Sequence, residues 1–513
     1  MRTAVIALIV AACSDPAPVA APLVVTWTPC TLATQAQEHA ECATVAVPYD
    51  WDDPSGRTID LFVKRYHTAG SHGQLWFLQG GPGGSDRALD GIAELFGDRH
   101  VGFDYYMLDQ RGTGSSTRLG CPAQEASGTP GGFAISDDEW PACLDAMQQT
   151  YEPTLAGFTV TNTARDLGEL ITATRGPDDA AIVYGVSYAP YMVNRYLQMF
   201  PDQPTAVVLD SICGPGDCSF TTADAKFDDV GRAFMTTCAA DATCAAHLGS
   251  DPAARLAAVY DELDAGHCPE AAAAGLTRTS LRHAFAEMLY DWDERILIPP
   301  LVYRLDRCGA QDLPVLRYFG SLVSAPLTAS GLDDFSTALF YQIALSELWD
   351  DPSPDAATFA AAEAHELMSN DVGVDLAKLQ DIWPRAPHDA YYGAWAVTDV
   401  PMLMLGGSLD PATPLAFEHG AMGAFHGANQ TFVTIPNASH GVLAESPTTG
   451  TTPCGAAITM AFVDNPTAPV DTSCVATVLP VTFTSSLAAM DFLNTTDLWG
   501  DGQSVAPMPT TRL

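Results

Sequence analysis

Short apolar runs recur along the chain between polar stretches and turn residues. Their length and their content of Val, Ile, Leu and aromatic residues are typical of buried β-strands. After residue 188 the apolar positions recur at helical spacing instead, on one face of a predicted helix. Strands that alternate with helices predict an α/β fold with a mostly parallel sheet. The strand-like runs are residues 75–78, 105–108, 180–184, 400–405 and 430–435.

The middle of the chain has a different pattern. Apolar side chains recur there every three or four residues, as in residues 253–260 and 280–289, which predicts helices. We interpret this stretch as a helical cap inserted between two core segments. A last core helix is expected over residues 485–493, followed by loose polar chain. The predicted division is a leader (1–12), a Pro- and Ala-rich tether (13–26), core residues 27–212, the helical cap (213–395) and core residues 396–513.

Ser187 stands between a predicted strand and a predicted helix, in the pentapeptide Gly185-Val186-Ser187-Tyr188-Ala189. A serine on a sharp turn of this kind projects its hydroxyl as an exposed nucleophile. The turn needs small residues two positions before and after the serine, and Gly185 and Ala189 meet that need. A five-residue match is common by chance, so the interpretation depends on the motifs elsewhere.

Two later strands end in residues of the types that activate a serine hydroxyl. Asp410 lies on the loop after residues 400–405, and His440 lies on the loop after residues 430–435. Histidine titrates near neutral pH and accepts the hydroxyl proton, while a buried carboxylate fixes its tautomer. Ser, Asp and His in this order along the chain form one of the known catalytic triads. Asp210, which ends the strand after the Ser187 helix, is the alternative acid; we prefer Asp410.

A glycine-rich loop, residues 80–84, follows the strand-like run 75–78. Without Cβ atoms in the way, its backbone N–H groups can approach a substrate carbonyl oxygen. We predict an oxyanion hole made by the N–H groups of Gly81 and Tyr188. Arg111, on the loop after residues 105–108, is interpreted as a partner in a structural ion pair rather than a catalytic residue.

Taken together, these motifs resemble those of α/β-hydrolases in the prolyl iminopeptidase and tripeptidyl aminopeptidase group of serine exopeptidases. The chain departs from the family pattern at two positions, because Gln79 stands where the family has His and Ala189 stands where it has Gly. The first departure bears on how the oxyanion loop is held. The matching segments are Gly80-Gly81-Pro82-Gly83-Gly84, Asp109-Gln110-Arg111-Gly112, Gly185-Val186-Ser187-Tyr188, Gly407-Ser408-Leu409-Asp410 and Ser439-His440-Gly441.

The resemblance implies an α/β-hydrolase core with an inserted helical cap and an aminopeptidase activity. Such an enzyme releases single residues or short peptides from free N-termini through an acyl-enzyme on Ser187. In this family the cap supplies carboxylates that hold the substrate's α-ammonium group. Glu347, flanked by apolar residues, is the preferred candidate, and the alternatives are Glu287, Asp291, Asp293 and Glu294. An esterase acting on small or natural-product esters, and a binding protein without catalysis, are the other interpretations.

The charge of the chain restricts its partners. It carries 62 acidic and 23 basic residues, for a net charge of −39. Such a field repels nucleic acid and anionic surfaces. Solubility explains the charge more simply than steering of cationic peptide amines does. No nucleotide-binding loop, metal-ligand cluster or CxxC pair stands out, so the sequence predicts neither a cofactor nor a metal.

The N-terminal residues predict export. Arg2 precedes a short apolar run, residues 4–12, and the segment ends in a box resembling that of lipidated bacterial lipoproteins, with Cys13 as the lipidated residue. An ordinary signal peptide is the alternative, so the protein is expected in the cell envelope or outside the cell. Removing Cys13 from the 13 cysteines leaves an even number, consistent with disulfides. A pairing of sequence neighbours is plausible: Cys30–Cys42, Cys121–Cys143, Cys213–Cys218, Cys238–Cys244, Cys268–Cys308 and Cys454–Cys474.

Overall fold

The computed structural model describes residues 20–31, 40–99 and 102–502. The predicted leader and the lipidation site at Cys13 lie outside these residues. Within them, no helix has both the length and the apolar content to cross a membrane.

The strands of the described residues form one nine-stranded sheet in the order β1-β2-β3-β5-β4-β6-β7-β8-β9. The first strands pair antiparallel up to the β3–β5 pair, and β5, β4 and all strands from β6 to β9 run parallel. This confirms the predicted α/β class with a mostly parallel sheet. The strands are β1 (Thr28–Pro29), β2 (Ala40–Pro48), β3 (Thr58–Tyr66), β4 (Gly73–Leu78), β5 (Asp104–Asp109), β6 (Ala180–Val186), β7 (Ala206–Asp210), β8 (Met402–Gly407) and β9 (Gln430–Ile435).

Helices cover both faces of this sheet, because alternate residues of each central strand point to opposite sides. In β4, Trp76 and Leu78 are buried in one apolar cluster, while Leu75 and Phe77 are buried in another. The first cluster takes in α2 (Trp140–Thr150), α3 (Val160–Thr174), α4 (Ala189–Met199) and α17 (Leu415–Ala424). The second takes in α1 (Asp90–Arg99) and α18 (Cys454–Asp464).

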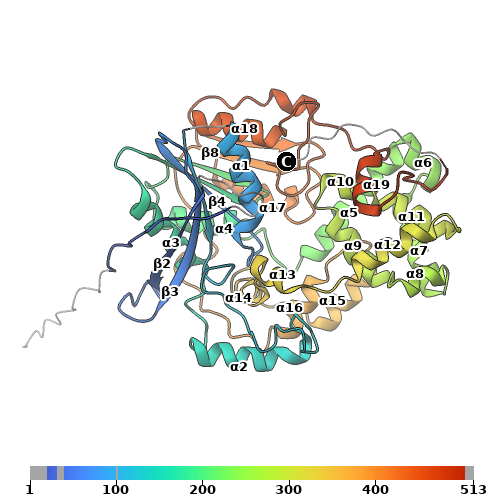
Figure 1. Ribbon diagram of the computed structural model, residues 1–513, viewed down its shortest axis with the longest axis horizontal. Helices are drawn as coiled ribbons and strands as arrows, with labels where there is room; N and C mark the ends of the chain where they lie inside the picture. Colours follow the sequence, from blue (N-terminus) through green and yellow to red (C-terminus); the bar gives the residue numbers. More distant parts are fainter. Residues whose placement is uncertain (1–19, 32–39, 100–101, 503–513) are drawn as a thin grey trace, which may run out of the picture.

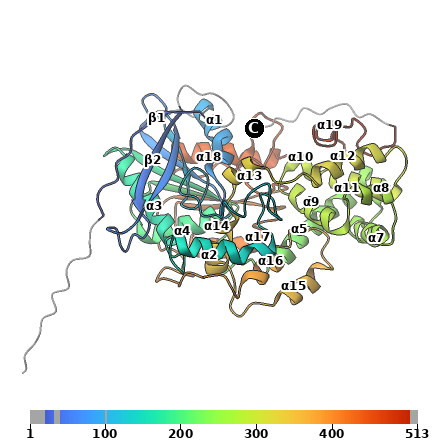
Figure 2. The ribbon, with the colours of Figure 1, turned by 60° about the horizontal axis from the view of Figure 1, so that its bottom comes forward.

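The long insertion between β7 and β8 is helical, as its pattern predicts. Its first helices have an apolar core of their own, which includes Phe234, Leu256, Phe285 and Leu301, and Figures 1 and 2 show α6–α12 gathered away from the sheet. The helices are α5 (Ala223–Ala240), α6 (Ala242–Leu248), α7 (Pro252–Asp264), α8 (Pro269–Ala273), α9 (Arg278–Met288), α10 (Trp292–Arg295), α11 (Ile298–Arg307), α12 (Leu313–Val323), α13 (Ala329–Asp334), α14 (Thr337–Glu347), α15 (Ala356–Glu363) and α16 (Val372–Leu379).

The last helices of the insertion pack differently from the first. Ile343 and Leu345 of α14 and Leu376 of α16 are buried in the same apolar cluster as α3 and α4. The insertion therefore joins the sheet domain through α14 and α16, while α5–α12 build a separate lobe.

The C-terminal segment corrects one expectation. Residues 485–493 do form a helix, α19 (Ser486–Leu493), but it does not pack on the hydrolase core. Ala489, Leu493 and Trp499 are buried in the apolar cluster of the cap, and Figure 1 shows α19 beside α10 and near α12. The ring of His247 stacks on Trp499 at 4.0 Å. An apolar helix face indicates burial, but it does not indicate which lobe buries it.

Six disulfides are present, and their pairing is that of sequence neighbours. Three of them, Cys213–Cys218, Cys238–Cys244 and Cys268–Cys308, lie in the insertion. The described residues contain no group of three or more His, Cys, Asp or Glu side chains able to hold a metal ion.

Candidate active site

Ser187 sits on the turn between β6 and α4 with a φ of +68°, in the left-handed region that non-glycine residues rarely adopt. A serine with this backbone strain, on a turn between a strand and a helix, is typical of a nucleophile turn. A Cβ atom on Gly185 would lie 3.2 Å from the Ala189 side chain. Glycine at the first position therefore leaves room for the methyl group at the second, which explains why Ala189 is tolerated in place of glycine.

The structure brings Asp410 and His440 together from the loops after β8 and β9. Both carboxylate oxygens of Asp410 lie 3.0 Å from Nδ1 of His440. The Thr413 hydroxyl and the N–H groups of Ala412 and Thr413 also donate to Asp410, at 2.9 to 3.0 Å. Burial alone would raise the pKa of Asp410, but His440 and these donors outweigh it and lower the pKa. Asp410 is thus a buried, ionised partner for the imidazole.

Asp210 has a different set of partners. Its carboxylate accepts hydrogen bonds from the Tyr184 hydroxyl at 2.7 Å and from the N–H groups of Val442 and Leu443 at 2.8 Å. Burial raises its pKa against these donors. Asp210 therefore anchors the chain just beyond His440, whereas Asp410 contacts the imidazole itself.

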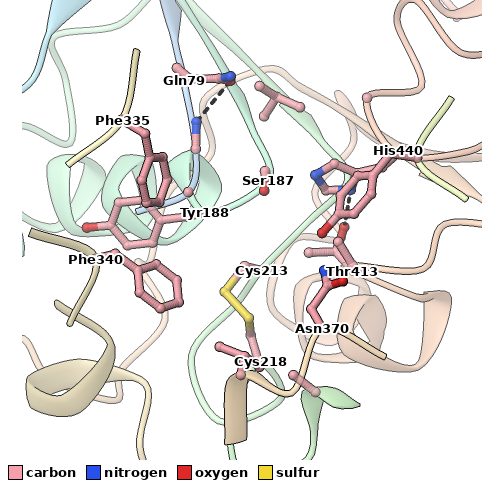
Figure 3. A pocket seen from close by; sticks show the side chains of 18 of the residues that line it. Gln79, Ser187, Tyr188, Cys213, Cys218, Phe335, Phe340, Asn370, Thr413 and His440 are labelled. Atoms are coloured by element: carbon pink, nitrogen blue, oxygen red, sulfur yellow. Dashed lines mark hydrogen bonds between the residues drawn. A yellow bond between two sulfur atoms is a disulfide. The ribbon is translucent and has the colours of Figure 1, made fainter. Parts of the chain in front are cut away.

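The environment of His440 suits a general base. Burial opposes the charged imidazolium, but the Asp410 carboxylate outweighs it, so the pKa of His440 is raised above 6.5. Ser187 and His440 both line one cavity, and Figure 3 shows Ser187 between Tyr188 on one side and His440 on the other. Ser187 and His440 therefore share one cavity, and Asp410 is bound to the same imidazole.

The glycine-rich loop approaches the serine closely. A Cβ atom on Gly80 would lie 2.5 Å from Cβ of Ser187, so this approach requires glycine. The Gly80 N–H donates to the side chain of Gln79 at 3.1 Å, and Gln110 donates to the Gln79 carbonyl at 2.7 Å. Gln79, which replaces the family's histidine, thus braces the loop from within.

Gly81 and Tyr188 both line the cavity beside Ser187. Within the described residues, neither backbone N–H has a hydrogen-bond partner. These are the two amides assigned above to the oxyanion hole.

Two family models match the chain. One, for the α/β hydrolase fold, matches residues 75–267, and the other, for a TAP-like protein, matches residues 369–474. The chain has the α/β-hydrolase fold. This agrees with the sheet order and with the serine turn, the acid loop and the histidine loop at the carboxyl ends of β6, β8 and β9.

Curated relatives of this α/β-hydrolase bear out the resemblance to tripeptidyl aminopeptidases. The tripeptidyl aminopeptidase of Streptomyces lividans is 28% identical over 207 residues, 37% of this chain and 38% of that protein. Serine protease Hip1 of Mycobacterium bovis is 30% identical over 263 residues, 47% of this chain and 49% of that protein. Carboxylesterase B of Mycobacterium tuberculosis is 40% identical over 84 residues, 15% of this chain and 16% of that protein. The matches thus span less than half the length of these relatives.

The cavity of the hydrolase has a volume of about 700 Å³, within the range of sites that hold small molecules. Its lining differs from one side of Ser187 to the other. Figure 3 shows Phe335, Tyr188 and Phe340 on one side, and Thr413 and Asn370 on the side of His440. One wall is therefore aromatic, while the wall beside His440 carries polar side chains together with Tyr290.

Glu347 does not reach this cavity, which corrects the preferred amine-binding candidate. Its carboxylate accepts a hydrogen bond from the Tyr191 hydroxyl at 2.9 Å and pairs with Arg195 at 3.0 Å. Both partners belong to α4, so Glu347 joins α14 to the helix after the nucleophile. It is a structural ion pair and leaves no carboxylate for a substrate amine.

Of the alternative carboxylates, Glu287 lines the cavity. It belongs to α9, and its side chain is exposed. Desolvation of the carboxyl group by the surrounding protein raises the pKa of Glu287, while the hydrogen bond with Asn370 and the nearby His283 oppose that rise. Asp291, by contrast, accepts the N–H groups of Asp293 and Glu294 at the start of α10.

Glu445, which the sequence reasoning missed, also lines the cavity. It lies five positions after His440, and its Oε2 accepts the Trp292 N–H at 2.7 Å. Burial raises the pKa of Glu445 to about 8. The available signal, which went unused, was an acidic residue on the same loop as His440.

Proposed function

We propose that this protein is an exported serine aminopeptidase that releases single residues or short peptides from free N-termini. The relatives support a serine peptidase of the α/β-hydrolase family. The observation that carries the finer proposal is the position of Glu287, a cap carboxylate on the wall of the cavity that also holds Ser187 and His440. An exopeptidase must recognise the free amine, and a fixed anion on the cavity wall does this.

In the proposed mechanism the Ser187 hydroxyl attacks the scissile carbonyl carbon while His440 takes its proton. The carbonyl oxygen becomes an oxyanion, and the N–H groups of Gly81 and Tyr188 stabilise it. His440 then gives its proton to the leaving amine as the C–N bond breaks, which leaves the acyl group on Ser187. Water, deprotonated by His440, releases the acyl group and restores the serine. Asp410 stabilises the imidazolium in both halves.

The aromatic wall and Glu287 recognise different parts of the substrate. Glu287 faces the α-ammonium group, whose positive charge favours the ionised carboxylate and offsets its raised pKa. Phe335 and Phe340 enclose an apolar side chain on the other side of Ser187. The volume of about 700 Å³ suits the end of a peptide rather than a folded chain.

The test is a matched substrate panel given to the purified protein and to three variants. The panel holds free-amine and N-acetylated mono-, di- and tripeptidyl anilides beside p-nitrophenyl esters. Ser187→Ala should abolish turnover of all of them. Glu287→Gln should raise KM for free-amine anilides by about 10–100-fold, as loss of one charge-assisted contact predicts, and leave N-acetylated esters unchanged.

Glu347→Gln is the matched control, since it makes the same change at a carboxylate that the cavity does not contain. It should leave KM for both substrate classes near the wild-type value. A selective KM effect in Glu347→Gln but not in Glu287→Gln would reverse the assignment. The number of residues in the released fragment gives the register of the enzyme.

Esterase activity is the second candidate, favoured by the local match to carboxylesterase B and by the aromatic wall. The same triad serves it, and the same panel separates the two. Cleavage of esters alone would establish the esterase. Cleavage of free-amine anilides would establish the aminopeptidase.

Export is supported by the six disulfides, which persist in oxidising compartments. A lipidated Cys13 would tether the protein to the membrane surface. The intact mass of the mature protein tests this, because a lipidated N-terminus adds acyl groups that an ordinary signal-peptide product lacks. Several free thiols in peptide mapping would argue against export.

A further inference from the structure

The loop that carries His440 is held from two sides. On the core side, the Gly441 N–H donates to the Ser211 hydroxyl at 2.8 Å, and the N–H groups of Val442 and Leu443 donate to Asp210. These bonds fix the chain immediately after the histidine. The residues before it are tied to the core loop after β8, where the Asn437 N–H donates to the Ser408 hydroxyl at 2.8 Å and the Leu409 N–H donates to the Ala438 carbonyl at 3.0 Å.

The other side is held by the cap, at the corner between α9 and α10. We call residues 289–295 the cap corner and residues 436–445 the histidine loop. The Ser439 hydroxyl donates to the Leu289 carbonyl, and the Arg295 guanidinium donates to the Asn437 carbonyl. The Trp292 N–H donates to Glu445 at 2.7 Å. Three hydrogen bonds thus join the cap corner to the histidine loop on both sides of His440.

Tyr290 completes the contact at the histidine itself. Its ring meets the His440 ring edge to face, with centroids 5.3 Å apart and planes at 88°. Such a geometry is favourable for aromatic pairs and restricts the orientation of both rings. The cap corner therefore bears on the imidazole directly as well as through its loop.

Arg295 is the unusual member of this corner. Its side chain is fully buried, it lies over the Trp292 ring at 4.4 Å, and burial lowers its pKa to about 10. Burying a charged guanidinium costs free energy unless the group is paired or hydrogen-bonded. Its one hydrogen bond among the described residues goes to the histidine loop.

We propose that the cap corner positions His440 for proton transfer, so that Arg295 and Ser439 are positioning residues of the reaction and not only parts of the cap. The cap then does more than enclose the substrate, because the general base is in register with Ser187 only while the corner is docked. This rests on the proposed serine chemistry but not on the identity of the substrate.

The experiment uses a small alkyl fluorophosphonate on the full-length protein. The reagent forms a bond between phosphorus and Oγ of Ser187, fluoride leaves, and His440 takes the hydroxyl proton. The labelling rate therefore reports on the Ser187–His440 pair without any cap contact to a substrate. It is measured by intact mass, with the site located by peptide mapping, over a range of pH.

The labelling rate of Arg295→Met and of Ser439→Ala should be about tenfold below that of the wild-type protein. Displacing a catalytic group by up to 1 Å lowers the reaction rate by up to about 100-fold. Arg304→Met is the matched control. Arg304 is also a buried cap arginine, but it binds Asp312 and the carbonyl of Leu498 instead of the histidine loop. This control should melt at a lower temperature and label at the wild-type rate.

The pH profile separates positioning from simple destabilisation. Asp410, Asp210 and Glu445 are the carboxylates that raise the pKa of His440. Ser439→Ala changes no charge, so looser contact between His440 and Asp410 should move the acid limb of the labelling rate to lower pH. Arg295→Lys, which keeps a donor, should recover part of the rate lost in Arg295→Met.

Wild-type rates and an unshifted acid limb in Arg295→Met and Ser439→Ala would overturn the proposal. Slowing in Arg304→Met as large as in Arg295→Met would overturn it too, because any damage to the cap would then suffice. If the wild-type protein is not labelled at Ser187, the proposed serine chemistry fails first, and the positioning role falls with it.

Discussion

Two buried arginines, Arg111 in the core and Arg295 in the cap, are held in different ways. In the core, Arg111 is fully buried, and its guanidinium binds both oxygens of Asp166 at 2.7 Å. It also donates to the carbonyls of Tyr49 and Gly157 at 2.6 Å. In the cap, Arg295 is equally buried, yet its Nε and Nη1 have no partner in the described residues.

The carboxylates show the same contrast. Glu363 and Glu366, at the end of α15 and just after it, are buried, and each keeps one oxygen without a partner in the described part of the chain. Burial raises the pKa of both to about 7, and Asp224 adds to the rise. Asp166 in the core has Arg111 as its counter-ion, whereas Glu363 and Glu366 in the cap keep their protons. These two carboxyls should therefore respond to pH near 7.

The largest expected effect concerns the chemistry that the core supports. Asp410→Asn should lower kcat by about 10⁴-fold, since the amide favours the wrong imidazole tautomer. It should also move the acid limb of kcat/KM to lower pH, because the carboxylate raises the pKa of His440. Asp210→Asn is the control and should reduce kcat far less. A larger loss in Asp210→Asn would make Asp210 the catalytic acid.

The next effect tests the contrast between the two arginines. Arg111→Met should destabilise the protein by about 3–5 kcal/mol, because it leaves Asp166 buried without its counter-ion. Arg295→Met strands no carboxylate in an ion pair, so its cost should be clearly smaller. Urea unfolding followed by tryptophan fluorescence compares the two midpoints. Equal shifts of the two midpoints would show that the loss of Arg111 and the loss of Arg295 destabilise the protein equally, which would contradict the contrast between the two arginines.

The smallest effect is the pH response of the cap. A carboxyl whose pKa is raised on folding binds more protons in the native state, so stability falls as pH rises from 4.5 toward 7. The double variant Glu363→Gln with Glu366→Gln imitates the protonated form. Its Tm should equal that of the wild-type protein at pH 5 and exceed it by a few degrees at pH 8. Parallel melting curves at both pH values would remove the proton-holding role.

The strands, and the loops that carry Ser187, Asp410 and His440, could be predicted because their signals are local. An apolar run followed by Gly-Val-Ser, by Asp410 or by His440 places each residue at the carboxyl end of a strand, and a parallel sheet then brings these ends together. Asp410 contacts the His440 imidazole, whereas Asp210 accepts hydrogen bonds from Val442 and Leu443, and no local pattern predicts these contacts.

The cap could be predicted as helical but not as packed. Glu347 was the preferred amine site because apolar neighbours predict burial, yet its partner Arg195 lies 152 positions away in the chain. The apolar neighbours of Glu347 predict that its carboxylate is buried, but they do not predict which residue neutralises it. The same gap explains α19, whose apolar face was assigned to the wrong lobe. Long-range partners decide both cases, and only the fold supplies them.

The C-terminal segment returns to the cap, and this return restricts how the cap lobe can move relative to the sheet domain. The insertion leaves the core after β7 and re-enters at β8, and these strands are neighbours in the sheet. Two adjacent connections alone would form a hinge. The chain crosses once more after Val478 and buries Phe483, Leu493 and Trp499 in the far lobe, so the lobe is tied at a third point. The lobe is then held to the sheet domain by three chain connections, and cutting the chain between residues 478 and 483 should let the lobe move more freely against the sheet.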